Sequence, residues 1–165
     1  MDAKNDTLAP DDNASDDGAL RRTFAYHLGE VARLWRGQID RQVRPLGLSF
    51  MQWLTLLQLS RADTDFVQKD LALAVGIEGP TMVGVLDRLV KAGLVERRVA
   101  RHDRRANTVH LTDGGRRVLD DAERELRKLR EVLLEGLSEA ELETSSAVLA
   151  RVGARAKAMS RGGGR

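Results

Sequence analysis

The chain has 165 residues, 42% of them hydrophobic and 32% charged, and no apolar stretch of membrane-spanning length, so we expect a globular protein without a membrane segment. It contains no cysteine, which excludes disulfides, a thiolate nucleophile and cysteine-ligated zinc or iron–sulfur sites, and suits a reducing cytosol. The net charge of +2 is unevenly spread: residues 1–18 hold six Asp and one Lys, a net charge of −5, so the other 147 residues carry +7, which is compatible with a polyanionic partner.

Residues 1–18 are rich in Asp, Asn and Ala and have no periodicity, which predicts a disordered acidic tail. They contain neither the basic region nor the apolar region of a signal peptide, so we expect a cytoplasmic protein. From Leu20 to Val43 the apolar residues recur every three or four positions. This spacing predicts one long helix, which Pro45 and Gly47 would end.

Three shorter helices are predicted next. Ser49 and Gln52 form a capping-box pattern that opens a helix rich in Leu and Trp, the expected centre of the core. A third helix covers residues 68–75 and is stopped by a glycine. Pro80, a residue favoured at the first helical position, opens a fourth helix over residues 80–92.

A hairpin and two long helices complete the predicted elements. Runs with β-branched residues at 94–99 and 107–111 surround a basic link and predict a β-hairpin. Thr112, and Ser138 in a second capping-box pattern, open two further helices. Apolar residues on both recur at spacings of three and four, which suits packing against another helix. Residues 161–165 are predicted to be a flexible tail.

The predicted fold is mainly α, with six helices and a small β-hairpin wing. Two short helices joined by a glycine-containing turn and followed by a hairpin are typical of a winged helix-turn-helix DNA-binding domain, which we expect at residues 48–112. Residues 19–47 and 113–160 form a helical region with longer apolar seams than one winged core needs. Homodimerisation would cover these seams, with packing inside one chain as the alternative. A two-fold dimer predicts a pseudo-palindromic site in double-stranded DNA.

The fourth helix is the candidate recognition helix, the one that enters the major groove. Its buried stripe is predicted at Val83, Leu86, Leu89 and Val90. The opposite face then presents the candidate reading residues Thr81, Gly84, Val85 and Arg88. We expect a hydroxyl contact from Thr81, a thymine-methyl contact from Val85 and a guanine or phosphate contact from Arg88, while Gly84 only permits close approach.

The link between the two strands is strongly basic, with five Arg among residues 97–105. A tip of this charge suits phosphates or a narrow minor groove. The residues expected at the DNA are Arg101, His102, Arg104 and Arg105. Asp103 is interpreted as the residue that orients the guanidinium of Arg105 through an ion pair. A solvated charged loop is the alternative, although such loops usually mix signs and mix Lys with Arg.

Other function classes have no comparable pattern. We find no nucleophile beside a base, no paired carboxylates and no phosphate-cradling loop, so we expect neither an enzyme nor a cofactor. The three His are scattered without metal-ligand spacing, which disfavours a metal site. The hairpin lacks the aromatic residues typical of single-stranded RNA modules. A helical protein-interaction module with a basic docking loop is the alternative function.

A small aromatic or carboxylate effector is a further hypothesis. Aromatic residues of the first two helices would line a crevice near the dimer interface, where pockets often form. These candidates are Tyr26, His27, Trp35, Phe50 and Trp53. Arg33 or Arg36 would neutralise a carboxylate. Aromatic residues at helical spacing are also typical of a core, and that interpretation stays open.

Residues 76–115 resemble the MarR family of transcription factors, in particular its SlyA-like branch. The likeness is carried by Leu86-Asp87-Arg88-Leu89, Gly93-Leu94-Val95-Glu96-Arg97, Asp103-Arg104-Arg105 and Leu111-Thr112. It implies a dimer whose first, fifth and sixth helices intertwine, with two wings in minor grooves. It also implies repression that small anionic or aromatic ligands relieve.

The resemblance also assigns roles to single residues. It places Arg105 in the minor groove, Arg104 at the phosphate backbone, and Pro80, Thr81 and Arg88 at the major groove. Gly84 departs from the pattern, because SlyA-like proteins commonly have Arg at this position. One major-groove contact would then be missing, and the wing would carry more of the affinity.

Overall fold

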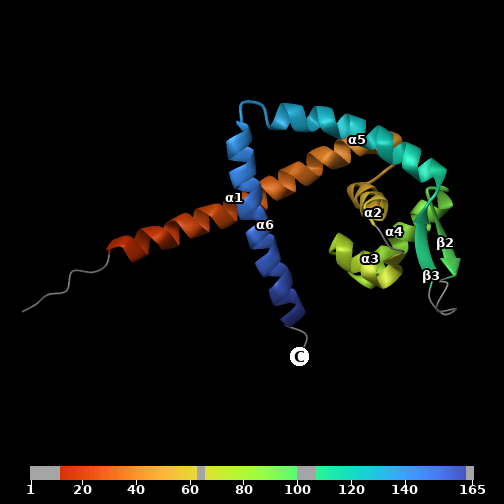
Figure 1. Ribbon diagram of the computed structural model, residues 1–165, viewed down its shortest axis with the longest axis horizontal. Helices are drawn as coiled ribbons and strands as arrows, with labels where there is room; N and C mark the ends of the chain where they lie inside the picture. Colours follow the sequence, from red (N-terminus) through yellow and green to blue (C-terminus); the bar gives the residue numbers. More distant parts are fainter. Residues whose placement is uncertain (1–11, 63–65, 100–106, 163–165) are drawn as a thin grey trace, which may run out of the picture. The chain divides into compact units, whose positions relative to one another are not determined.

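The computed structural model describes residues 12–62, 66–99 and 107–162. The chain divides after Leu126 into two units, which we treat separately. The elements follow the predicted order of four helices, a hairpin and two helices (Figure 1), with one 3-10 turn and one short strand added. They are α1 Asp12–Val43, η1 Arg44–Leu46, α2 Phe50–Ser60, β1 Phe66–Val67, α3 Gln68–Val75, α4 Gly79–Lys91, β2 Val95–Val99, β3 Asn107–Leu111, α5 Asp113–Leu133 and α6 Glu139–Gly162.

Helix α1 begins earlier than the sequence predicts. Residues 12–18, assigned to the disordered tail, are helical, while residues 1–11 lie outside the described part. Asp17 accepts a hydrogen bond from Nε of Arg21 at 2.9 Å, one helical turn further on. Such pairs stabilise a helix, and carboxylates near its N-terminus interact favourably with the helix dipole. The acidic composition that suggested disorder is therefore compatible with a helix start.

The turn between α1 and α2 is formed as the sequence predicts. Pro45 lies in η1, and Gly47 follows with φ 77°, a left-handed conformation that favours glycine. Ser49 then caps α2: its Oγ accepts from the amide of Gln52, whose side-chain Oε1 accepts from the amide of Ser49. The predicted capping box is confirmed, and it fixes the start of the most buried helix.

Helices α2, α3 and α4 pack together around the core of the first unit, beside the sheet (Figure 1). The predicted bounds of α3 are confirmed, and those of α4 are correct to within one residue. Gly76, with φ 77°, ends α3 and allows the chain to turn into α4. The largest fully buried side chains include Leu56, Leu71, Met82, Leu86 and Leu89.

The sheet has three antiparallel strands in the order β1-β3-β2. The predicted hairpin is confirmed, and its register pairs Val95 with Leu111 and Arg97 with Val109. The sequence did not predict β1, which pairs Phe66 with Val109. A strand of two residues is too short to show a period, and it exists only through its pairing with β3.

The first turns of α5 pack tightly against the chain that leaves α4. Thr112 caps α5, since its Oγ1 accepts from the amide of Gly115 at 3.0 Å and donates to the carbonyl oxygen of Gly93 at 2.7 Å. Gly115 is buried beneath the carbonyl group of Leu94. Leu119 and the apolar residues that follow at the predicted seam positions as far as Leu126 are also buried.

The second unit contains the end of α5 and helix α6. Oε2 of Glu141 accepts from the amide of Ser138, and the amide of Glu141 donates to Oγ of Ser138, which confirms the second capping box. Helix α6 continues to Gly162, so the predicted flexible tail is wrong for residues 161–162; residues 163–165 lie outside the described part. Across the described ranges we find no helix with the length and hydropathy needed to span a bilayer.

Candidate nucleic-acid interface

Helix α4, the candidate recognition helix, packs against α2, α3 and β2. Its buried stripe consists of Met82, Val85, Leu86 and Leu89, at the helical spacing i, i+3, i+4 and i+7. The prediction that Val85 reads DNA is therefore wrong, because its side chain is only 2% exposed. Val83 and Val90, both predicted to be buried, are 40% and 39% exposed. Apolar residues occur on both sides of this helix, so two stripes fit the sequence pattern and packing selects the one that contains Met82.

Four of the five candidate reading residues do lie on the open side of α4. Pro80, Thr81 and Arg88 are exposed, and Gly84 is half-buried between them. A Cβ placed on Gly84 would lie 3.8 Å from Nη1 of Arg88, so the guanidinium of Arg88 lies beside the backbone at Gly84. Asp87 also lies on this side and was not among the candidates.

An ion pair joins α4 to the hairpin. Nη2 of Arg97, on β2, donates to Oδ1 of Asp87 at 2.7 Å. The Arg97 side chain is 35% exposed and the Asp87 side chain 57% exposed, so the pair lies at the surface. Asp87 lacks an obvious signal in the sequence, since its partner is ten residues away and belongs to another element.

The same pair borders a groove of about 330 Å³ between α4, the start of α3 and the sheet. Its lining residues are Gln68, Val83, Asp87, Arg97, Asn107 and Val109. We call this the helix–sheet groove. Three of the six side chains belong to the hairpin, which therefore forms one wall of the groove.

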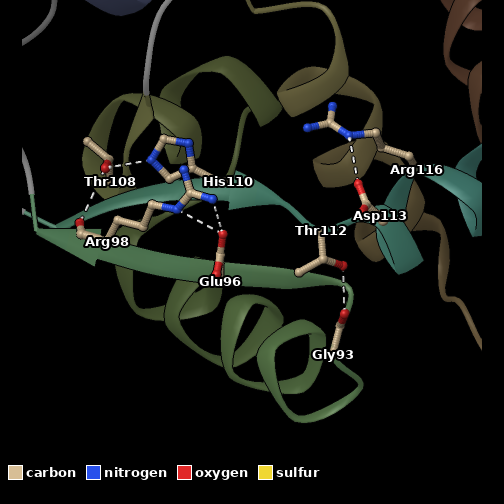
Figure 2. Close-up of polar contacts among 8 residues, drawn as sticks. All are labelled: Gly93, Glu96, Arg98, Thr108, His110, Thr112, Asp113 and Arg116. Carbon is tan, nitrogen blue, oxygen red and sulfur yellow. Dashed lines mark hydrogen bonds and ion pairs between the residues drawn. The ribbon is translucent and has the colours of Figure 1, made fainter.

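The opposite face of the hairpin carries a separate polar cluster (Figure 2). Glu96 accepts two hydrogen bonds from the guanidinium of Arg98, one of them from Nε at 2.8 Å. Oγ1 of Thr108 donates to the carbonyl oxygen of Arg98 at 3.2 Å and lies 2.8 Å from Nε2 of His110. Successive residues of a strand point to opposite faces, so Arg97 faces α4 and Arg98 faces away from it.

The tip of the wing lies outside the described residues. Arg101, His102, Asp103, Arg104 and Arg105 all belong to this stretch. The two strands that carry the tip are described and correctly paired, from Val99 on one side and Asn107 on the other.

The aromatic candidates for a ligand site fall into separate groups. The Phe50 and Trp53 rings lie 5.7 Å apart, and the guanidinium of Arg36 lies 5.2 Å from the Phe50 ring centroid. Tyr26 and His27 form a second pair on α1, in an edge-on geometry. Trp35 is half-buried.

Hydrogen bonds fix the surroundings of the Phe50 and Trp53 pair. Nε1 of the buried Trp53 donates to Oε1 of Glu123 on α5 at 3.1 Å. The amide of Phe50 donates to Oδ1 of Asp40 at 2.9 Å, and this bond, with a further one from Arg44, holds the pKa of Asp40 below its usual range. Trp53 is thus part of the core as well as of the aromatic pair. The described residues contain no group of three or more potential ligands that could hold a metal ion.

Residues 46–106 match the family model described as "MarR family". The solved structure of transcriptional regulator PA3341 is similar at 37% identity, with 81% of this chain and 98% of that chain covered and a TM-score of 0.74. The repressor CouR bound to a 23-mer DNA duplex has 28% identity, coverages of 82% and 96%, and a TM-score of 0.74. CouR from Rhodococcus jostii RHA1 bound to p-coumaroyl-CoA has 24% identity, coverages of 78% and 90%, and a TM-score of 0.71.

The structure of SlyA shares the fold, with 22% identity, coverages of 81% and 94% and a TM-score of 0.72. The expected fold of six helices with a small β-hairpin wing is therefore the fold of known regulators. With the family model matched across the helix-turn-helix and the hairpin, and 37% identity over almost the whole of a known regulator, this chain belongs to the MarR family of transcriptional regulators.

Proposed function

We propose that the protein is a homodimeric repressor that binds double-stranded DNA at a pseudo-palindromic site and is released by a small aromatic or anionic ligand. The observation that carries the proposal is the open face of α4, which presents Thr81 and Arg88 beside a basic hairpin held in place by the Arg97–Asp87 pair. A helix of this kind fits the major groove, and its flanking hairpin reaches the next minor groove. The DNA complex of CouR supports the same use of this fold.

The reading face of α4 is small. Thr81 supplies a hydroxyl, and Arg88 supplies a planar fork of donors that fits guanine or phosphate. Pro80 lies at the first turn, where free backbone amides favour a phosphate. Gly84 adds no side chain, and the Arg88 guanidinium lies beside its backbone. Sequence discrimination by α4 therefore rests mainly on Arg88.

The wing tip would supply the remaining contacts. We assign Arg105 to the minor groove, Arg104 and His102 to the phosphate backbone, and Asp103 to the orientation of Arg105. Arg101 adds positive charge next to the DNA. This assignment rests on the resemblance and on the density of Arg in the link.

Dimerisation would cover apolar surface on α1 and α6. Phe24, Val31 and Leu34 on α1 are exposed in the single chain, as are Leu149 and Met159 on α6. Apolar surface of this extent on long helices is typical of an interface with another copy. The two recognition helices of such a dimer would read two related half-sites.

The effector would bind near the Phe50 and Trp53 pair, where Arg36 adds a positive charge. The ring of an aromatic ligand would pack against Phe50 and Trp53, and a carboxylate or phosphate of that ligand would meet Arg36. The p-coumaroyl-CoA complex of CouR supports this ligand class. Tyr26, His27 and Trp35 would line the same site only if the partner protomer contributed them in the dimer. We further infer that the protein acts in the cytoplasm and is not an enzyme.

Fluorescence anisotropy with a duplex from the region upstream of the protein's own gene tests DNA binding, repeated over a range of salt concentrations. We expect Arg105→Ala to weaken binding by about 1–3 kcal/mol per half-site without a change in thermal stability. Arg22→Ala removes the same charge from α1, outside the helix-turn-helix, and is the control. Binding that does not depend on salt, or equal losses in both variants, contradicts the role of the wing.

A further inference from the structure

The helix–sheet groove has a composition that the reading face and the wing tip do not explain. It combines one guanidinium, one carboxylate and two side-chain amides with two valines. The carboxylate and guanidinium are paired with each other, and the pair remains open to solvent.

The position of this groove follows from the proposed mode of DNA binding, on which the present inference rests. Helix α4 would lie in a major groove and the hairpin in the adjacent minor groove. One sugar–phosphate strand separates these two DNA grooves along their whole length. That strand must cross the protein surface between α4 and the hairpin, and the helix–sheet groove lies between these two elements.

We propose that the helix–sheet groove is a binding site for the sugar–phosphate strand that separates the two DNA grooves, with Arg97 as its phosphate-contacting residue. The Arg97 guanidinium has five N–H donors, and its hydrogen bond to Asp87 uses one at Nη2. Gln68 and Asn107 supply amide N–H donors to the same groove, and Val83, which is 40% exposed, offers apolar surface to a deoxyribose ring.

Asp87 is a positioning residue in this site. Its carboxylate carries the wrong charge to meet a phosphate, and it acts by holding Arg97 in one orientation before DNA arrives. A guanidinium fixed by one carboxylate loses less side-chain entropy when it binds a phosphate with its remaining donors. The same pair couples the recognition helix to the hairpin, so a phosphate bound here contacts both DNA-binding elements at once.

The salt dependence of binding tests the contact of Arg97 with a phosphate. Each phosphate that a protein neutralises contributes about one unit to the slope of log K against log [salt]. With one such contact in each protomer, we expect Arg97→Gln to reduce the slope by about two for a dimer. Arg97→Lys keeps a positive charge at this position and should keep the slope, although it loses the planar fork and some affinity.

Arg98→Gln is the matched control. Arg98 is the next residue on the same strand, is also paired with a carboxylate, and faces away from α4. Its loss removes the same net charge without touching the groove. Equal changes of slope in Arg97→Gln and Arg98→Gln would overturn the inference, since both would then reflect charge alone.

A duplex with single neutral methylphosphonate linkages identifies the phosphate directly. We expect one linkage in each half-site, between the bases that α4 contacts and those that the hairpin contacts, at which Arg97→Gln no longer weakens binding. If the loss persists at every linkage, Arg97 acts only through the hairpin and the inference is wrong. Thermal unfolding of each variant separates these effects from misfolding, because an exposed ion pair contributes at most about 1 kcal/mol.

The two proposals fail in different ways. A wild-type protein that binds no duplex overturns the proposed function and the groove with it. A wild-type protein that binds duplex with a steep salt slope, while Arg97→Gln matches Arg98→Gln, overturns the groove alone.

Discussion

Replacing Gly115 with Ala should destabilise the protein, although Ala favours helices by about 1 kcal/mol over Gly. A Cβ at Gly115 would lie 2.0 Å from the carbonyl oxygen of Leu94, where real contacts begin near 3.0 Å. The backbone at Leu94 or at Gly115 must therefore move by about 1 Å. The hydrogen bond from the Thr112 amide to the Leu94 carbonyl oxygen, which is 3.1 Å long, is then strained or lost. Overpacking costs about 1–3 kcal/mol and the bond about 1 kcal/mol, which leaves a net loss of about 1–3 kcal/mol.

Gly114→Ala is the matched control for this prediction. A Cβ there lies 3.5 Å from the nearest atoms, an ordinary contact, so we expect it to be neutral or to stabilise by up to about 1 kcal/mol. Urea unfolding followed by circular dichroism, at equal protein concentrations because a dimer's stability depends on concentration, measures both variants. If Gly115→Ala unfolds at the same or a higher urea concentration than wild type, the close approach of α5 to Leu94 does not constrain this position.

Three further predictions concern the core and its polar contacts. The hydrogen bond from the Phe50 amide lowers the pKa of Asp40 in the folded protein. Asp40 therefore stabilises the fold at pH values above its unfolded pKa of about 4, and this stability is lost as the pH falls through the lower folded pKa. Asp40→Asn should flatten the pH dependence of the free energy of unfolding in this acidic range. Trp53→Phe keeps an aromatic ring but removes the pyrrole part of the buried indole with its Nε1 bond to Glu123, and should cost about 1–3 kcal/mol in urea unfolding. Val85→Ala should cost about 2 kcal/mol and Val83→Ala under about 0.5 kcal/mol, and the reverse order would restore the original assignment of the α4 faces.

Local signals in the sequence predict most element boundaries correctly. The capping boxes that begin at Ser49 and Ser138 depend on residues three positions apart, and the structure confirms both. Gly47 and Gly76 take the left-handed conformation at the predicted chain turns, which glycine adopts without the steric cost of a Cβ. These features need no knowledge of the rest of the fold.

The errors arise where packing between distant residues decides the outcome. The buried face of α4 is set by its neighbours α2, α3 and β2, and this reversed the assignments of Val83 and Val85. Strand β1 exists only by pairing with β3, which lies about forty residues later. Asp87 joins the site through an ion pair with another element. The resemblance named the Asp87 position but could not assign it a partner.

Besides the packing of its buried residues, helix α5 makes hydrogen bonds to two parts of the protein with different roles. Its N-terminal cap, Thr112, donates to the carbonyl oxygen of Gly93, directly after the recognition helix, and about three turns further on Glu123 accepts from the indole of Trp53 beside Phe50. A molecule that displaces the indole from Glu123 removes one of these two attachments. A movement of the first turn of α5 would reach the end of α4 through the hydrogen bond from Thr112 to Gly93 and the packed backbone around Gly115. The tight fit at Gly115 makes this transmission stiff, because it leaves no free space to absorb the movement.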